Sequence, residues 1–395
     1  MNADIMLNDK NKNSFCPGHW NDLYFAPSQG YSYACCKSKP IDILEPEEFE
    51  KRRENSLNGI RDEGCSYCWE IEDSGQESLR QYKIRLAKEW HDNVKATLVL
   101  GNLCNFQCTY CNAKYSSRWQ TDEKLNGRIK LKYDSSVYYD GVECENKPAE
   151  VFLEYLDKNP QITSLFISGG EPFMGDVLYE ILSNADLSNI KKIFVSSNLS
   201  FPNTKTLDKF LSFADGRVLG INPSLDTVNP NVQEYIRYGF DWKIFNKNLN
   251  FLFTQTPVRI HFNSLITAHT IFGIDKLYEF IYALKEDYLE RINWFMSPCV
   301  QPRICSFEIL KEEEKEMAIP KLEKIKLEIE KLLPKSTLRY KFDKEYMQIN
   351  TLISILQNTK FNHEVRKDQQ NFFKQFNERH NITTPKELEF LIKEK

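Results

Sequence analysis

The sequence has no long apolar run, and this excludes a conventional membrane-spanning helix. No stretch of its 395 residues approaches the roughly 18 consecutive apolar residues that cross a bilayer. The first 14 residues are polar and lack the apolar segment and cleavage site of a secretory signal. We therefore expect a cytoplasmic protein without a membrane partner.

Compositional bias is also absent. The chain has only 15 Gly and 16 Pro, and its 52 basic and 56 acidic side chains leave a formal charge of −4. These values exclude collagen-like and disordered chains, and we detect no internal repeat. No overall positive field recruits nucleic acid, so a nucleic-acid partner is not expected.

The six histidines form no pair at metal-ligand spacing, whereas cysteine is abundant and clustered. Of 11 cysteines, five lie between Cys16 and Cys68 and three between Cys104 and Cys111. Structural disulfides are rare in a reducing compartment, so clustered cysteines there favour metal or iron–sulfur ligands and catalytic thiols.

Short apolar runs alternate with amphipathic stretches through the middle of the chain. We expect buried strands at Ala96–Leu100, Ser164–Ser168, Lys192–Ser196, Val218–Asn222, Val258–Leu265 and Asn293–Met296. Helices are expected at Ala149–Asp157, Val177–Ser183, Thr206–Phe213, Trp242–Phe253 and Lys276–Glu286. This alternation predicts an α/β fold with a parallel sheet, and six units suggest a partial (β/α)6 barrel of the TIM type.

Three domains are expected on this basis. Residues 1–92 form a small Cys-rich domain, residues 93–305 the partial barrel, and residues 306–395 a helical C-terminal extension. The small domain cannot bury much apolar surface, which suggests that a metal centre holds it. In the extension, the charged run Lys311–Glu316 is expected to be a solvated helix face.

The most specific motif is the loop Gly101–Cys111, which directly follows the first expected strand. It carries Cys104, Cys108 and Cys111 at x3 and x2 spacing. Three thiols so spaced can ligate three corners of a cubane cluster and leave the fourth iron open. Structural zinc, the alternative, needs four ligands from two separated pairs, and Asn112 offers no fourth one.

This loop resembles the CxxxCxΦC hallmark of the radical S-adenosylmethionine (SAM) superfamily, with Tyr110 at the aromatic position. The resemblance implies a [4Fe-4S] cluster whose open iron binds SAM and whose electron cleaves it to methionine and a 5′-deoxyadenosyl radical. Ser168–Pro172, after the second strand, is similar to the family's GGEP motif. There Gly169, Gly170 and Glu171 would contact the SAM amino group.

Softer similarities to the family follow later strands. Ser197 and Asn198 lie at the ribose-binding position, and Ser224, Asp226 and Arg237 resemble the SxD…R arrangement that would hold the SAM carboxylate. Helix capping by Ser224 and Asp226 with a surface pair at Arg237 is the structural alternative. Asn263 is a further candidate adenosine contact.

The N-terminal cysteines resemble the SPASM/twitch modules, which hold an auxiliary iron–sulfur cluster. The candidate ligands are Cys16, Cys35 (at Gly-x4-Cys spacing, with Cys36 spare), Cys65 and Cys68. In many relatives the module follows the barrel, whereas here it precedes it. A zinc ribbon built from the same cysteines is the alternative.

The resemblance implies an enzyme that abstracts a substrate hydrogen, with an electron donor such as flavodoxin or ferredoxin. One expected substrate is a peptide or protein side chain that is oxidised or cross-linked, and the other is a small sugar-like or nucleotide metabolite. Cys299, just beyond the sixth strand, is a candidate substrate-facing thiol. A non-catalytic zinc-binding interaction protein is the alternative from another class.

Overall fold

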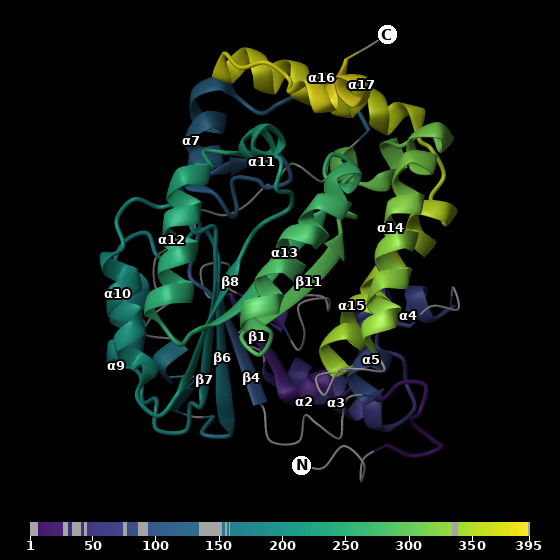
Figure 1. Ribbon diagram of the computed structural model, residues 1–395. Coiled ribbons are helices and arrows are strands. Elements are labelled where there is room, and N and C mark those ends of the chain that lie inside the picture. The colour runs from purple at the N-terminus through teal and green to yellow at the C-terminus, as the bar shows by residue number, and fades with distance from the viewer. Residues whose placement is uncertain are drawn as a thin grey trace. The chain divides into compact units, whose positions relative to one another are not determined.

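The computed structural model describes residues 7–26, 31–33, 41–42, 46–73, 77–85, 94–133, 152–154, 156–157, 159–333 and 339–393 (Figure 1). The chain forms two compact units. Unit 1 comprises Met1–Gly101, Val142–Val195 and Lys205–Leu219, and unit 2 comprises Asn102–Gly141, Ser196–Thr204 and Gly220–Lys395. In the described part of the chain, no helix is long and apolar enough to cross a membrane.

The six expected barrel strands are all present and run parallel to their neighbours in each unit, which confirms the predicted partial barrel class. Unit 1 contains β4 (Val94–Val99), β6 (Ile162–Ser168) and all but the last two residues of β7 (Lys192–Ser197), in the order β7-β6-β4. Helices α9 (Val177–Asn184) and α10 (Lys205–Leu211) follow β6 and β7. In α9 the buried residues Leu178, Ile181 and Leu182 recur at helical spacing, because only one face of the helix packs inward.

The N-terminal region continues this sheet. Strand β1 (Asp22–Ala26) pairs in parallel with β4, and β2 (Tyr31–Tyr33) and β3 (Ile41–Asp42) extend the sheet antiparallel. Short helices follow, namely α3 (Pro46–Leu57), α4 (Ser66–Asp73) and α5 (Leu79–Arg85).

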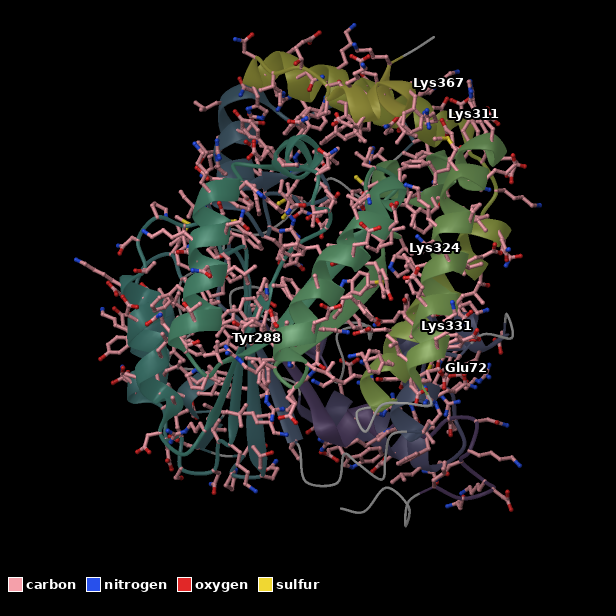
Figure 2. The ribbon with its side chains drawn as sticks, viewed as in Figure 1. Glu72, Tyr288, Lys311, Lys324, Lys331 and Lys367 are labelled. Carbon is pink, nitrogen blue, oxygen red and sulfur yellow. The ribbon has the colours of Figure 1, made fainter. Side chains whose placement is uncertain are left out.

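The interior of this region is small and rich in buried charge. Phe15 is fully buried, and only a few partly buried apolar side chains pack on it. The buried Arg80 guanidinium donates to both carboxylate oxygens of Glu72, at 2.8 and 2.6 Å, and lies over the Trp69 ring; Glu72 is labelled in Figure 2. Among the described residues of this region, buried ion pairs such as Arg80–Glu72 therefore accompany the apolar contacts around Phe15.

Unit 2 contains the other three barrel strands, apart from the first two residues of β8. Strand β10 (Arg259–Ile266) pairs with both β8 (Val218–Pro223) and β11 (Ile292–Pro298). Helices α11 (Pro230–Ile236), α12 (Trp242–Gln255) and α13 (Ile274–Tyr288) connect them, and α11 is a helix that the sequence pattern missed. Tyr288, which ends α13 (Figure 2), stacks on Phe253 of α12 at 4.7 Å between ring centroids.

The C-terminal region is helical, as predicted, and packs within unit 2. Helices α14 (Glu312–Leu332) and α15 (Arg339–Asn358) lie side by side (Figure 1). A buried ion pair of 2.5 Å joins Lys285 of α13 to Glu345 of α15. The extension is therefore built onto the barrel helix α13.

The charged run at the start of α14 corrects one expectation. Glu314 and Lys315 are buried, so Lys311–Glu316 is not wholly a solvated face. Both carboxylate oxygens of Glu314 accept hydrogen bonds from Arg366 of α16 (His363–His380), and the Lys315 ammonium donates to the carbonyl of Thr359. The partners of Glu314 and Lys315 are distant in the sequence, so the local spacing of charges gives no sign that these two side chains are buried.

The buried histidine in the turn after β10 should make the protein less stable in acid. His269 is 2% exposed beside Gln369 of α16, and burial lowers its pKa from 6.5 to about 3. Because the unfolded chain then binds the proton more readily, stability falls as the pH drops from about 6.5 to 3. At pH 5 we expect this residue to cost about 2 kcal/mol relative to pH 8.

Urea unfolding of the wild type and His269→Gln at both pH values measures this cost. The difference between pH 8 and pH 5 should be smaller in His269→Gln by that amount, whereas His363→Gln, at an exposed histidine, should behave as wild type. Equal pH dependence in all three proteins would contradict the prediction.

Candidate active site

The three cysteines of the CxxxCxΦC loop lie together in unit 2, between the end of β4 and helix α7 (Ser117–Asn126). Cys108 is buried, Cys104 and Cys111 are half-buried, and none is in a disulfide. Burial raises the pKa of Cys108 to about 11. The pKa of Cys111 is raised by burial and then by the charges of Cys108 and Cys104.

The surroundings of the three thiols bear on whether they fit an iron–sulfur cluster. Cys104 and Cys108 lie close enough to Cys111 to disfavour its ionisation, and iron binding would overcome this by displacing the thiol proton. No group of three or more Cys, His, Asp or Glu among the described residues is placed to hold a single metal ion. Cysteine thiolates are the ligands of cubane clusters, so three thiols outside any disulfide fit such a cluster by their chemistry.

The backbone of the loop is held from several sides. Strand β5 (Gln107–Cys108) pairs antiparallel with β9 (Arg237–Tyr238), so Cys108 lies opposite Arg237. The indole nitrogen of Trp119 donates to the carbonyl of Cys108 at 2.9 Å. The hydroxyl of Ser117 accepts from the Cys104 amide at 3.1 Å. The positions of the thiols are thus determined by helix α7 and strand β9.

Helix α7, which the sequence pattern missed, is itself supported by α16. Trp119 packs against Phe376 at 5.8 Å between ring centroids, and Arg379 pairs with Asp122 at 2.7 Å. Asp368 accepts hydrogen bonds from the backbone amides of Lys132 and Tyr133, which follow α7. Helix α16 is therefore linked to the cysteine loop through helix α7.

Tyr110, Asp226 and Arg237 form a buried network beside the loop. The Tyr110 hydroxyl donates to Asp226 at 2.5 Å, and Arg237 donates to both Asp226 oxygens, at 2.8 and 3.2 Å. The second Asp226 oxygen also accepts from the Leu265 amide. Burial alone would lower the pKa of Arg237, but the Asp226 carboxylate outweighs it and raises that pKa well above its usual value. The aspartate thus orients Tyr110 and Arg237 together.

Ser197 and Asn198 form a tight turn at the end of β7, in unit 2 from Ser196 onward. The Ser197 hydroxyl accepts from the Leu199 amide, and Asn198 donates to the side chain of Asn105 at 2.8 Å. Leu199 has a φ of +51°, a backbone conformation that residues other than glycine rarely adopt. Asn105, inside the cysteine loop, is a contact that the sequence analysis missed, because nothing in the spacing links it to Asn198.

Ser224 continues the polar row at the end of β8. Its amide donates to the Ser197 carbonyl at 2.9 Å, and it forms an isolated parallel bridge with Asn263 of β10. Asn222, two residues earlier, has a buried side-chain oxygen with no hydrogen-bond partner among the described residues. The ends of β8 and β10 therefore carry neighbouring polar side chains.

The Ser168–Pro172 motif lies in unit 1, at the end of β6. Ser168 accepts from the amide of Leu100, just after β4. Gly169 has a φ of +93°, and a Cβ atom there would lie 2.7 Å from Val99 and 2.9 Å from the carbonyl of Gly101. Glu171 is buried and accepts from the Phe173 amide at 3.1 Å. This close backbone approach requires glycine at position 169.

In the N-terminal region, Cys16 and Cys68 both lie within electrostatic range of Cys65, whereas Cys35 lies outside the described residues. Burial, and then the charge of Cys16, raises the pKa of Cys65 to about 12. His19 contacts Cys65, with 3.4 Å between Nε2 and Sγ. His19 belongs to no histidine pair, and the Cys16-x2-His19 spacing is the sequence signal that could have found it.

Cys299 is 2% exposed, and its thiol donates to the carbonyl of Gln301 at 3.3 Å. Its amide donates to the carbonyl of Ile266, at the end of β10. A reactive role for this thiol would require local opening, because catalytic cysteines are accessible to their substrates.

The polar strand ends and the cysteine loop fall within one family match. Residues 98–267 match the Radical SAM superfamily, so this part of the chain is a radical SAM domain. No curated protein sequence matches the chain.

Solved structures of two proteins are similar to this chain at low identity. SuiB of Streptococcus suis bound to S-adenosylmethionine is 14% identical, covers 66% of this chain and 64% of its own, and gives a TM-score of 0.37. SuiB bound to the precursor peptide SuiA is 14% identical with coverage of 75% and 77% and a TM-score of 0.35. Native anSMEcpe with bound AdoMet is 18% identical with coverage of 61% and 62% and a TM-score of 0.39. In the first match, this chain spans just under two thirds of the length of SuiB.

Proposed function

We propose that this protein cleaves SAM reductively and uses the resulting radical to abstract a hydrogen from a peptide or protein side chain, which is then oxidised or cross-linked. Cys104, Cys108 and Cys111 hold the [4Fe-4S] cluster. An auxiliary iron–sulfur cluster, held by N-terminal cysteines, takes part in the oxidation.

The observation that carries this proposal is the cysteine loop itself. Cys104 and Cys108 lie close to Cys111, none of the three is in a disulfide, and the loop lies inside the segment that matches the Radical SAM superfamily. A reduced cluster supplies one electron that splits SAM into methionine and a 5′-deoxyadenosyl radical when SAM is bound.

The remaining roles belong to the polar groups at the strand ends. Arg237, fixed by Asp226, presents positive charge for the SAM carboxylate, and Ser224 adds a hydroxyl. Ser197 and Asn198 are proposed to contact the ribose. In unit 1, Gly169 and Gly170 permit close backbone approach, and Glu171 is proposed to accept from the SAM ammonium group.

The cleavage reaction can be tested without knowing the substrate. Anaerobically purified protein should contain iron and sulfide, and it should form 5′-deoxyadenosine when given dithionite and SAM. Flavodoxin or ferredoxin should replace dithionite as the electron donor. Zinc in place of iron, with no 5′-deoxyadenosine, would contradict the enzyme and favour the zinc-binding interaction protein.

The class of substrate requires a separate test. A neighbouring gene for a short Cys- or Gly-rich precursor would identify a candidate peptide, whereas neighbouring glycosyltransferase genes would favour a small metabolite. The candidate, synthesised with deuterated side chains, should transfer deuterium into 5′-deoxyadenosine. Transfer from a deuterated metabolite and not from the peptide would replace the peptide proposal by the metabolite alternative.

A further inference from the structure

His19 brings a polar ring into the group of N-terminal cysteines. It lies in the short helix α2 (Gly18–Asn21), whereas Cys65 lies 46 positions further along, directly before α4. The ring is 2% exposed and its Nε2 atom lies 3.4 Å from Cys65 Sγ. Arg53 of α3 donates to the His19 carbonyl at 3.0 Å, which holds α2 in place. The contact is thus a defined tertiary contact between two segments.

The surroundings of the other ring nitrogen, Nδ1, bear on what this contact does. Nδ1 of His19 is buried and has no hydrogen-bond partner among the described residues. The defined polar contact of the His19 ring is therefore the one between Nε2 and the Cys65 sulfur. A thiol can donate to Nε2, but a thiolate bound to iron is only an acceptor. Once the cysteine binds a cluster, the contact persists only if Nε2 carries the hydrogen and donates.

Buried cations also lie around these cysteines. Lys83 and Arg52 are each 3% exposed. A Cβ atom on Gly18 would lie 2.8 Å from the Lys83 ammonium and 3.3 Å from the Cys16 sulfur, so both groups face the same side of Gly18. Arg52 pairs with Asp62 at 3.3 Å and acts electrostatically on Cys65. Positive charge and an N–H donor stabilise an anionic, thiolate-bound group.

We infer that His19 donates a hydrogen bond from Nε2 to the cluster-bound sulfur of Cys65 and so raises the reduction potential of the auxiliary cluster. The inference rests on the auxiliary cluster of the proposed function. Hydrogen bonds to ligand sulfurs favour the reduced cluster, which carries one more negative charge. A higher potential makes the cluster a better electron acceptor, which suits the oxidation of a substrate radical. His19 is thus a positioning and tuning residue, not a ligand.

The experiment isolates the auxiliary cluster in the full-length chain. Cys104, Cys108 and Cys111 are replaced by alanine, so that only N-terminal iron remains and SAM cleavage does not enter the measurement. In this background, iron content and the midpoint potential are measured for the parent, which keeps His19, and for its His19→Phe and His19→Gln variants. His363→Phe, at an exposed histidine, is the matched control.

The His19→Phe variant should retain its iron, while the reduced-to-oxidised ratio at the parent's midpoint potential falls about tenfold. For a one-electron couple this is a midpoint about 59 mV more negative. His19→Gln, which keeps an N–H donor, and His363→Phe should remain close to the parent. If His19→Phe loses iron, His19→Gln decides: a parental potential supports the hydrogen bond, and a tenfold shift or loss of iron overturns it.

Two further outcomes separate this inference from the proposed function. An unchanged potential in an iron-loaded His19→Phe variant overturns the role of His19 and leaves the auxiliary cluster intact. Absence of iron from the parent background, with His19 present, overturns the auxiliary cluster and the inference together, while SAM cleavage by the wild type is unaffected by that result.

Discussion

Replacement of Cys104, Cys108 and Cys111 by alanine is expected to abolish formation of 5′-deoxyadenosine and to remove about four irons per chain. The wild type should hold about eight irons, because the proposed function places a second cluster on the N-terminal cysteines. Loss is expected to be complete for cleavage because no other described cysteine lies in this loop. Iron and sulfide assays, with 5′-deoxyadenosine measured after addition of dithionite and SAM, give both quantities.

Cys305→Ala is the matched control. This thiol is also buried in unit 2, and it contacts the carbonyl of Thr109 at 3.8 Å, but it lies outside the CxxxCxΦC loop. It should keep wild-type iron and cleave SAM. If the triple variant formed 5′-deoxyadenosine at the wild-type rate, the assignment of the cluster to this loop would be wrong.

Asp226→Ala is expected to destabilise the protein by about 3–5 kcal/mol, because it leaves the Arg237 guanidinium buried without its partner. Tyr110 and the Leu265 amide lose their acceptor in the same step. Since Arg237 then moves, the dissociation constant of SAM should rise on the order of tenfold, equivalent to about 1.4 kcal/mol. Urea unfolding and SAM titration of the reconstituted protein measure the two effects.

An exposed ion pair provides the comparison. Asp176 and Lys209 are 2.8 Å apart, but their side chains are 60% and 42% exposed. Solvent screens such a pair, so Asp176→Ala should cost less than about 1 kcal/mol and leave SAM binding unchanged. Asp226→Asn should restore part of the stability, because an amide still accepts hydrogen bonds from Arg237. Equal costs for Asp226→Ala and Asp176→Ala would show that the buried network contributes nothing special.

The sequence by itself determined the elements and motifs whose signals are local. Alternating apolar runs located the barrel strands, and cysteine spacing located the loop that follows β4. Gly169 is also a local signal, because its φ of +93° excludes most other residues. Such features depend on neighbours along the chain, and those are visible in the letters.

Only the tertiary structure decided which distant residues meet. Tyr110 and Asp226 are 116 positions apart, and Asp122 and Arg379 are 257 apart. The burial of Glu314 and the contact of His19 with Cys65 likewise depend on segments that come together only in the fold. The free energy of these contacts comes from burial and from paired charges, and neither depends on separation along the chain. Spacing within one segment therefore could not reveal them.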